Sequence, residues 1–218
     1  NQFMIDLSVI IVSYNSSKDI VPCINSIEDT KGHLNLEIIV VDNNSADDTV
    51  NVVRQAYPHV YLISNQYNAG FPEANNQAIR LARGKFIILL NPDTFVKAGA
   101  LQSMINFMEE NPSVGICGPS LTDANGVNMP YLISFGTLSR IVLIFGLIIG
   151  KRLKTPISKN MQEYVSGAAL LFRAELTKEV GLLDRDLFWM EDIDFCTRAK
   201  KKGYFVAIVP QAEIIHFV

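Results

Sequence analysis

One segment joins a buried strand to a polar end, and it reads Lys85-Phe86-Ile87-Ile88-Leu89-Leu90-Asn91-Pro92-Asp93-Thr94. Its apolar run is typical of a strand that is covered on both faces of a sheet. A second segment has the same design, with Leu36-Glu37-Ile38-Ile39-Val40-Val41 leading into Asp42-Asn43-Asn44-Ser45. Ligands of an open α/β sheet gather outside the carboxyl ends of the strands. Two acids delivered there by separate strands predict a site for a metal ion and a polar, phosphate-bearing ligand.

The flanking sequence alternates short β-branched runs with amphipathic segments. In the first half we expect strands at residues 7–13, 37–41, 60–64 and 86–90 and helices at 18–29, 47–56, 71–83 and 98–110. In the second half we expect strands at 114–121, 164–172 and 204–209 and helices at 174–180 and 191–202. This alternation predicts an α/β fold with a mostly parallel central sheet and helices on both faces.

Length and composition favour one globular domain, since the chain has 218 residues, of which 49% are hydrophobic and 19% charged. A net charge of -3 offers no basic face, so no nucleic-acid partner is expected. Cys23, Cys117 and Cys196 are widely spaced and are predicted to be reduced core thiols of a cytoplasmic protein. No secretory signal opens the chain, and its end at Val218, just after a strand-like run, favours a truncated C-terminus.

The longest apolar stretch runs from Leu132 to Gly150 and is interrupted by Arg140. Basic residues follow it as far as Lys154, which is the composition of a segment that lies along an anionic membrane surface. A core helix followed by a solvated basic loop explains the stretch equally well. The internal arginine argues against a transmembrane span.

The first predicted strand ends at Ser13-Tyr14-Asn15-Ser16-Ser17, a loop without glycine. A dinucleotide-binding fold needs glycines there so that the backbone can approach a pyrophosphate, which argues against a dehydrogenase. The same absence disfavours a P-loop protein and a nucleotidyltransferase. Tyr14 can stack on a base, although a half-buried packing ring would look the same in sequence.

Asp42 precedes the predicted start of a helix, and its carboxylate suits the ribose or base of a nucleotide. The neighbouring Asp47 and Asp48 are explained as helix-capping residues. Further along, Asn68-Ala69-Gly70-Phe71-Pro72 opens another helix, whose free backbone N–H groups can hold an anion.

Asn91-Pro92-Asp93 is the candidate metal site. A departing nucleoside diphosphate needs its charge neutralised, and Mg²⁺ or Mn²⁺ does this with few protein ligands because the phosphates supply others. Asp93 suits that role. The same three residues also occur as a plain helix-initiating turn, and from this motif alone the two interpretations are even.

The last predicted helix begins with Trp189-Met190-Glu191-Asp192-Ile193-Asp194. Three acids in a first turn interact favourably with the helix dipole, which is sufficient reason for their presence. The same field keeps a carboxylate ionised, as a general base must be, and Phe188 and Trp189 offer an apolar wall that raises its proton affinity.

Together these segments resemble family 2 glycosyltransferases with the GT-A fold, in particular a rhamnosyltransferase-like bacterial branch. The matching segments are Val9 to Asn15, Val40 to Ser45, Asn68 to Phe71, Leu89 to Thr94, Ser166 to Ala168 and Glu191 to Asp194. The resemblance implies a single GT-A domain over residues 1–218. Its half at about 1–113 would bind the nucleotide sugar, and its half at about 114–218 would bind the acceptor and supply the base.

The resemblance also assigns roles. Asp192 is implied as the catalytic base, with Glu191 second and Asp194 a helix or acceptor contact. Asp93 is implied as a metal ligand for Mg²⁺ or Mn²⁺, although Asn91 replaces the first acid of the family's Asp-x-Asp motif. His216 falls where some members of the family place a histidine on the metal, and a structural role of a lone histidine near a terminus explains it equally well. The residues implied in nucleotide-sugar binding are Ser13, Tyr14, Asn15, Asp42, Asn44, Asn68, Gly70, Asn91 and Asp93.

The family implies an inverting transfer from a nucleotide-diphosphate sugar to a hydroxyl of a glycan or lipid-linked acceptor in bacterial cell-surface polysaccharide synthesis. A dTDP-rhamnose or UDP-sugar donor is favoured, and GDP-sugars are compatible. The expected location is cytoplasmic, with peripheral contact at the inner membrane face through Leu132 to Lys154. The alternative is a non-catalytic sugar-nucleotide-binding module in which Asn91 marks lost chemistry.

Overall fold

The computed structural model describes residues 5–129, 162, 164–187 and 189–217. Its strands are β1 (Leu7–Ser13), β2 (Leu36–Asp42), β3 (Tyr61–Ser64), β4 (Phe86–Leu90), β5 (Thr94–Val96), β6 (Val114–Thr122), β7 (Ala169–Arg173) and β8 (Phe205–His216). Its helices are α1 (Ile20–Thr30), α2 (Thr49–Ala56), α3 (Phe71–Ile79), α4 (Ala100–Glu110), α6 (Leu176–Val180) and α7 (Glu191–Lys201). The segment from Leu132 to Lys154 lies outside the described residues, and so do both alternatives for it.

All of these strands form one sheet, in the order β3-β2-β1-β4-β7-β6-β8-β5. The pairings β1–β2, β1–β4, β2–β3 and β6–β8 are parallel, whereas β7 and β5 run antiparallel to their neighbours. The chain winds outward from β1 to β3 and then returns through α3 to place β4 on the other side of β1. The gap between β1 and β4 is therefore a topological switch point, where open α/β sheets bind ligands.

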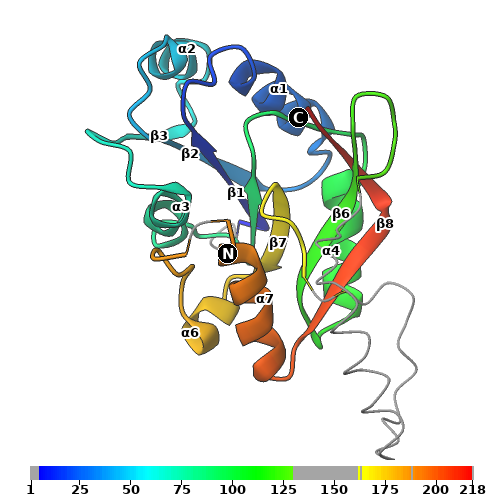
Figure 1. Ribbon diagram of the computed structural model, residues 1–218. Helices are drawn as coiled ribbons and strands as arrows, with labels where there is room; N and C mark the ends of the chain where they lie inside the picture. Colours follow the sequence, from blue (N-terminus) through cyan, green and yellow to red (C-terminus); the bar gives the residue numbers. More distant parts are fainter. Residues whose placement is uncertain (1–4, 130–161, 163, 188, 218) are drawn as a thin grey trace, which may run out of the picture.

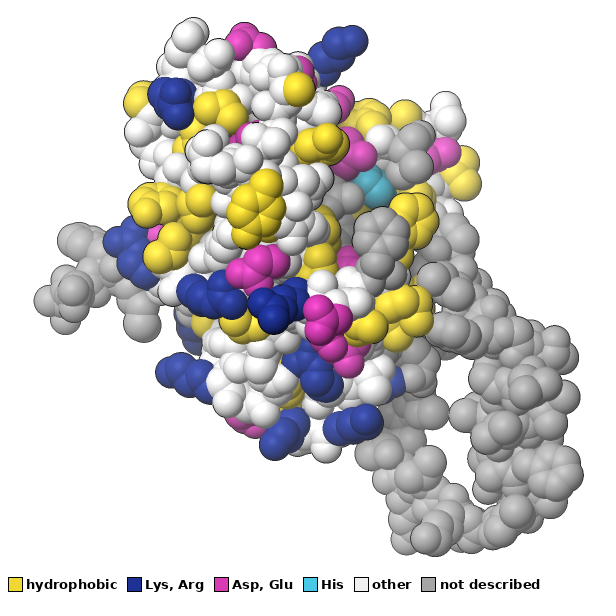
Figure 2. Space-filling view, turned by 60° about the vertical axis from the view of Figure 1, so that its left-hand side comes forward, with side chains coloured by type: hydrophobic (Ala, Val, Ile, Leu, Met, Phe, Trp, Pro, Cys, Tyr) yellow, Lys and Arg dark blue, Asp and Glu magenta, His cyan; other side chains and the backbone are white. Residues whose placement is uncertain are grey.

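Helices cover both faces of the sheet (Figure 1). One core lies under α1, α2 and α4, with Ile24 and Met104 fully buried in it. The other lies under α3, α6 and α7, where the rings of Phe172 and Phe195 meet edge to face at 5.2 Å. The predicted α/β fold with a mostly parallel sheet is thus confirmed. On the side that carries α3 and α6, Lys and Arg side chains gather over the lower part (Figure 2).

The three cysteines are free and buried, as expected for core thiols. Burial raises the pKa of the Cys23 thiol to about 12, so it stays protonated. Its sulfur lies 3.6 Å from the Asn91 carbonyl oxygen and 3.6 Å from Thr94 Oγ1, beneath the loop that follows β4. Cys23 therefore supports that loop as a packing group.

Several element boundaries differ from the sequence-based expectation. α3 ends at Ile79 rather than Arg83, and β7 begins at Ala169 because residues before it form a turn. β5 was not anticipated. β8 continues to His216 instead of ending at Val209, so the histidine lies in the strand and not beyond it.

The two halves of the chain are interleaved. β5, from the first half, pairs with the end of β8, opposite the edge formed by β3. The buried Arg173 guanidinium donates hydrogen bonds to the carbonyl oxygens of Val114 at 2.9 Å and Met108 at 2.5 Å. α4, β6 and β7 are thereby fixed to one another. Among the described residues, none of the helices combines the length and apolar character needed to cross a bilayer.

Candidate functional site

A cavity of about 460 Å³ opens at the carboxyl ends of the central strands. Ser13 at the end of β1 is level with Asp42 at the end of β2, and Leu90 at the end of β4 is level with Ala169, the first residue of β7. Four strands thus deliver their end residues to one edge. The cavity is lined by Val12, Tyr14, Asn15, Ser16, Asp19, Asn43, Asn68, Gly70, Phe71, Asn91, Pro92 and Asp93.

Asp42, the predicted contact of the nucleotide ribose or base, is only 1% exposed and does not line the cavity. Its Oδ1 accepts hydrogen bonds from Ser13 Oγ at 3.1 Å and from Ser45 Oγ at 2.5 Å. Its Oδ2 accepts one from the Ser45 backbone N–H at 2.9 Å. Because both carboxylate oxygens are engaged, Asp42 holds the loops after β1 and β2 together in this structure. Its contact with a nucleotide stays a prediction.

Ser45 also fixes the loop after β1. Ser45 Oγ accepts the Asn15 N–H at 2.8 Å, and Asn15 Oδ1 accepts the Ala46 N–H at 2.8 Å. Asn15 and Asn44 have positive φ angles of 54° and 68°, a conformation that asparagine tolerates better than most residues. This leaves the Tyr14 side chain at the cavity, 54% exposed and open to a planar partner.

Asn43 organises the next wall of the cavity and is missing from the predicted site residues, although the quoted motif contained it. It is 3% exposed, and its Oδ1 accepts hydrogen bonds from Asn65 Nδ2 at 3.1 Å and from the Ala69 N–H at 3.0 Å. Its Nδ2 donates to Asn68 Oδ1 at 2.9 Å, and the same oxygen accepts the Gly70 N–H. One buried amide therefore ties the end of β2 to the start of α3.

The corner after β4 gathers the predicted metal ligands. The pairing of β5 with β8 brings His216 Nε2 to 3.3 Å from Asp93 Oδ1 and 3.4 Å from Asn91 Nδ2. Asp93 Oδ1 is buried and has no hydrogen-bond partner in the part of the chain that the structure describes. An orphaned carboxylate oxygen beside an imidazole nitrogen fits a divalent cation such as Mn²⁺ or Mg²⁺.

No cluster of three or more His, Cys, Asp or Glu side chains suited to a metal occurs in the described residues. Asp93 and His216 would therefore hold a cation weakly without further oxygen ligands. The phosphates of a bound nucleotide supply such oxygens, and Asn91 is neutral where a second acid would compete with them for the cation.

Asp192 lies in the first turn of α7 and is not among the residues that line the cavity. Its Oδ2 accepts the Gly167 N–H at 2.9 Å, and its Oδ1 accepts the Ile193 N–H at 2.7 Å. A methyl group added to Gly167 would lie 3.6 Å from Phe71 Cε1 and 3.8 Å from Asp192 Oδ2, so the aspartate borders the wall that Phe71 forms. Burial raises the pKa of Asp192, and the backbone N–H groups that it accepts act against the rise.

Glu191 has a different setting. It is 8% exposed, and its Oε2 has no hydrogen-bond partner among the described residues. Burial is the first cause that raises its pKa, while the backbone N–H groups of Glu191, Met190 and Trp189 lower it. Asp194 is paired with Arg198 one turn later, with Oδ2 at 2.7 Å from Nε, which agrees with a helix contact. Of the two residues expected to form an apolar wall, Trp189 is 78% exposed, and Phe188 lies outside the described residues.

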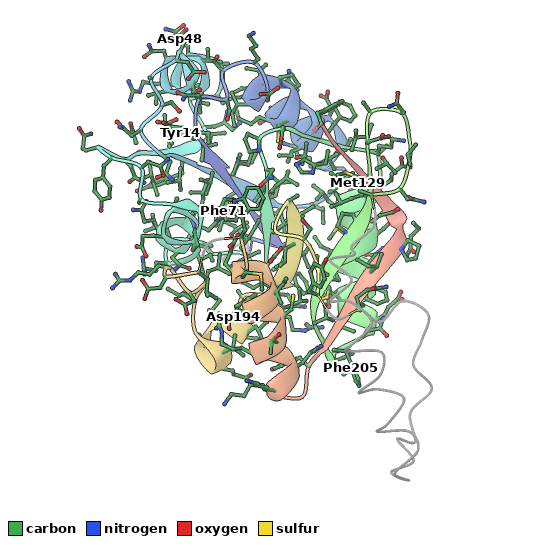
Figure 3. All side chains as sticks on the ribbon, viewed as in Figure 1. Tyr14, Asp48, Phe71, Met129, Asp194 and Phe205 are labelled. Atoms are coloured by element: carbon green, nitrogen blue, oxygen red, sulfur yellow. The ribbon has the colours of Figure 1, made fainter. Side chains whose placement is uncertain are left out.

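The cavity lining includes some of the predicted residues, namely Tyr14, Asn15, Asn68, Gly70, Asn91 and Asp93, and does not include the others, namely Ser13, Asp42, Asn44, Glu191, Asp192 and His216. Asp192 is linked to Asn91 through the turn before β7. Asp192 accepts the Gly167 N–H, and the carbonyl oxygen of the next residue, Ala168, accepts the Asn91 N–H at 3.0 Å. Figure 3 shows Phe71 between Tyr14 and the helix that carries Asp194. Besides Asn43, the sequence reasoning missed Asp19, Phe71 and Gly167 as site-forming residues. Of these four residues, Asn43, Phe71 and Gly167 stood inside quoted motifs, and Asp19 did not.

The sequence matches the family model "Glycosyl transferase family 2" over residues 8–181. The chain belongs to glycosyl transferase family 2. This family 2 member is 27% identical to N-acetylglucosaminyl-diphospho-decaprenol L-rhamnosyltransferase of Mycobacterium tuberculosis, over 83% of this chain and 66% of the relative. It is 30% identical to poly(ribitol-phosphate) beta-glucosyltransferase of Bacillus spizizenii, over 79% of this chain and 26% of that protein. The chain therefore spans two thirds or less of these relatives.

Solved structures confirm the GT-A fold of this family 2 member. S. aureus TarS 1-349 superposes with a TM-score of 0.72 at 19% identity, over 97% of this chain and 60% of TarS 1-349. GalNAc-T7, solved with UDP, GalNAc and Mn²⁺, superposes with a TM-score of 0.75 at 14% identity, over 100% of this chain and 45% of that structure.

Proposed function

We propose that this glycosyltransferase moves a sugar, with inversion, from a nucleotide-diphosphate sugar to a hydroxyl of a glycan or lipid-linked acceptor in cell-surface polysaccharide synthesis. One observation carries the proposal. A half-buried acid, Asp192, approaches Phe71 at Gly167, and a carboxylate with an orphaned oxygen, Asp93, lines the same cavity as Phe71. A base for the acceptor and a ligand for the cation that neutralises the leaving group are thus both available.

The proposed chemistry is a direct displacement. Asp192 accepts the proton of the acceptor hydroxyl while that oxygen bonds to the anomeric carbon. The bond from this carbon to the diphosphate breaks on the opposite face, and its electron pair leaves with the nucleoside diphosphate. Asp93 and His216 would hold a divalent cation, which supplies charge neutralisation to the diphosphate when bound.

We propose that the loop around Tyr14 and Asn15 and the wall around Asn68 and Gly70 hold the nucleotide sugar. Support comes from their shared cavity, from the exposed Tyr14 ring and from φ of +81° at Gly70, which turns the chain into α3. Asp42 and Ser13 would act indirectly, since their hydrogen bond fixes the end of β1, from which the loop with Tyr14 and Asn15 starts. Asn44 is exposed in the loop after β2. A dTDP-rhamnose or UDP-sugar donor is favoured, because the curated relatives include rhamnosyl- and glucosyltransferases.

The proposed location is cytoplasmic, at the inner membrane face, where a lipid-linked acceptor would be found. Two relatives are named for acceptors of this kind, decaprenol- and undecaprenol-diphosphate sugars. Membrane contact through Leu132 to Lys154 is part of this proposal. A chain that lacks residues 132–154 should lose binding to anionic vesicles, and unchanged binding would contradict it.

A thermal-shift panel tests the donor and the metal together. We expect one of dTDP-rhamnose, UDP-glucose, UDP-GlcNAc or GDP-mannose to raise the melting temperature, and Mn²⁺ to enlarge the rise. The stabilising donor should then give a product with a GlcNAc-diphosphate probe that carries a short alkyl chain. Donor binding without transfer or hydrolysis would favour the alternative, a non-catalytic sugar-nucleotide-binding module.

A further inference from the structure

The turn before α7 holds an aromatic side chain in an unusual conformation. Trp189 has φ of +64°, a region that bulky residues rarely adopt and that costs on the order of 1–3 kcal/mol. The same side chain is 78% exposed, so burial of the indole does not offset this cost. Met190, the next residue, is 38% exposed. Two apolar side chains therefore face solvent from a strained turn.

The turn is followed by a buried acid, Glu191, whose carboxyl group restrains it. Glu191 is 8% exposed, and the backbone N–H groups of Trp189 and Met190 face its carboxyl group. Removing Glu191 from water is costly unless its oxygens are engaged, yet its Oε2 has no partner among the described residues. The buried Glu191 carboxylate therefore restrains the strained turn in the conformation that exposes the Trp189 side chain.

The strained turn that carries Trp189 lies close in sequence to Asp192, the proposed base. Trp189 is three residues before Asp192, a span of about 11 Å at most. Asp192 borders Phe71 through Gly167, and Phe71 lines the cavity proposed for the donor. The acceptor must reach Asp192 from the side opposite the leaving group. Trp189 and Met190 directly precede α7, whose first turn carries Asp192.

We propose that Trp189 is the platform on which a sugar ring of the acceptor stacks, with Glu191 as the residue that positions it. One face of a pyranose is made of C–H bonds with partial positive charge, and an indole face carries negative charge density. Stacking covers both apolar faces and leaves the sugar hydroxyls free for Asp192 and water. This inference rests on the proposed transferase function and names the subsite that the acceptor uses.

Fluorescence offers a direct test, because Trp189 is the only tryptophan in the chain. The probe is the alkyl GlcNAc-diphosphate to which the wild-type protein transfers sugar. Titration without donor should shift the indole emission to shorter wavelength. The shift should be half complete at the dissociation constant that calorimetry gives. Saturable binding with unchanged emission would overturn the platform. An emission shift on anionic vesicles but not with the probe would overturn it too, since it would place Trp189 in a membrane interface.

Substitution provides the second test. Trp189→Ala should raise the KM for the probe about tenfold, the change expected from losing about 1.4 kcal/mol of binding, while the rate of donor hydrolysis and the donor Kd stay unchanged. Trp189→Phe should restore much of the loss. The matched control is Tyr61→Ala, which removes another exposed aromatic side chain, from β3 at the sheet edge.

The outcomes separate the two proposals. Normal transfer by Trp189→Ala with an unchanged probe KM would overturn the platform and leave the transferase function standing. A wild-type protein that neither transfers nor hydrolyses any donor would instead overturn the transferase function itself. Equal loss of donor and probe binding in the variant would show a general folding defect rather than a lost platform, and would also contradict the inference.

Discussion

Asp192 and Glu191 are adjacent in sequence but occupy different surroundings. Asp192 accepts the Gly167 N–H at the wall shared with Phe71, whereas Glu191 turns into the protein beneath the strained turn. Burial raises the pKa of both. Only Asp192 therefore combines a raised proton affinity with a position at the proposed reaction site. This contrast is why we assign the base to Asp192 and the positioning role to Glu191.

Replacing Asp192 by Asn should lower the transfer rate by about 10²–10⁴-fold, the usual contribution of a positioned general base. Donor binding should stay nearly intact, because the amide keeps the shape of the carboxylate and lies away from the nucleotide. Calorimetry with donor and a transfer assay measure the two effects. The matched control is Asp194→Asn in the same turn, whose carboxylate pairs with Arg198. Parallel loss of donor binding and transfer would contradict the base role.

The pH dependence of transfer should show the environment of Asp192. A base works only when ionised, and burial raises the pKa of this carboxyl above its ordinary value of about 4. Activity should therefore be complete at pH values above the raised pKa and be lost as the pH falls through it. A profile of kcat/KM against pH gives the midpoint. A midpoint below about 4 would show that backbone hydrogen bonds outweigh burial at this site.

At the scale of elements, loops rather than strands shape the cavity. The Asn43 amide joins the end of β2 to the start of α3, and Asp42 joins the loops after β1 and β2. Both side chains are buried, so water cannot readily replace their hydrogen bonds in the folded protein. The geometry of the donor site thus depends on two side chains that a nucleotide need not touch.

Asn43→Asp should weaken donor binding about tenfold. The variant loses the Nδ2 donor to Asn68 Oδ1 and places a carboxylate next to that oxygen, in a cavity meant for an anionic ligand. Calorimetry with the favoured nucleoside diphosphate measures the change in Kd. Asn106→Asp on the exposed face of α4 controls for the added charge, since Asn106 is exposed and its Oδ1 accepts a hydrogen bond from Gln102. Equal Kd values in the variant and the wild type would contradict the positioning role of Asn43.

The entry to β4 requires glycine for steric reasons. A methyl group at Gly84 would lie 2.4 Å from Ser8 N and 2.6 Å from Phe86 O, both backbone atoms that cannot move alone. Gly84→Ala should therefore lower the free energy of unfolding by about 3 kcal/mol or more. Gly126→Ala, at φ of +77° in open space, isolates the cost of a left-handed backbone, about 1–2 kcal/mol. Urea unfolding should rank the two variants in this order, and the reverse order would contradict the steric account.

The central strands were predictable because their apolar runs are continuous and end at polar turns. β5 was not, because three residues give no periodic signal and their partner strand lies more than a hundred positions later. The end of β8 was missed for a related reason. Val209 pairs with Pro119 and Glu213 with Ser120, so the register shifts between them, and Pro210 and Gln211 interrupt the apolar pattern there.

The site could be predicted where a side chain follows a strand and not where loops meet. Asp93 and Asp192 could be proposed from the sequence because each stands at an element boundary with a chemical reason for an acid. The Asn43 network and the approach of Gly167 to Phe71 depend on contacts between loops far apart in sequence. The inward turn of Asp42 depends on Ser13 and Ser45 in the same way. No local pattern indicates such contacts.

At the scale of the whole molecule, a buried cation joins the two halves of the chain. Arg173 in β7 donates to Met108 and Asn111 at the end of α4 and to Val114 at the start of β6. It also lies over the ring of Phe86, 5.5 Å from the centroid. The proposed division near residue 113 therefore separates roles and not folding units.

Arg173→Lys should destabilise the protein by about 2–3 kcal/mol, because one ammonium group cannot reach all three carbonyl oxygens. Unfolding should remain a single transition at lower denaturant concentration. Arg80→Lys is the matched control, since Arg80 forms a half-exposed ion pair with Glu73 and should change stability by about 0–1 kcal/mol. Two separate transitions in the Arg173 variant would show that the halves fold independently.

The pairing of Thr94 with His216 has a consequence for biosynthesis. During translation, Asp93 leaves the ribosome long before the histidine that faces it. The proposed cation corner therefore stays incomplete until the end of β8 has been synthesised. Sugar-nucleotide turnover would begin only once residue 216 has been synthesised and β8 has paired with β5, so half-made chains would not consume donor.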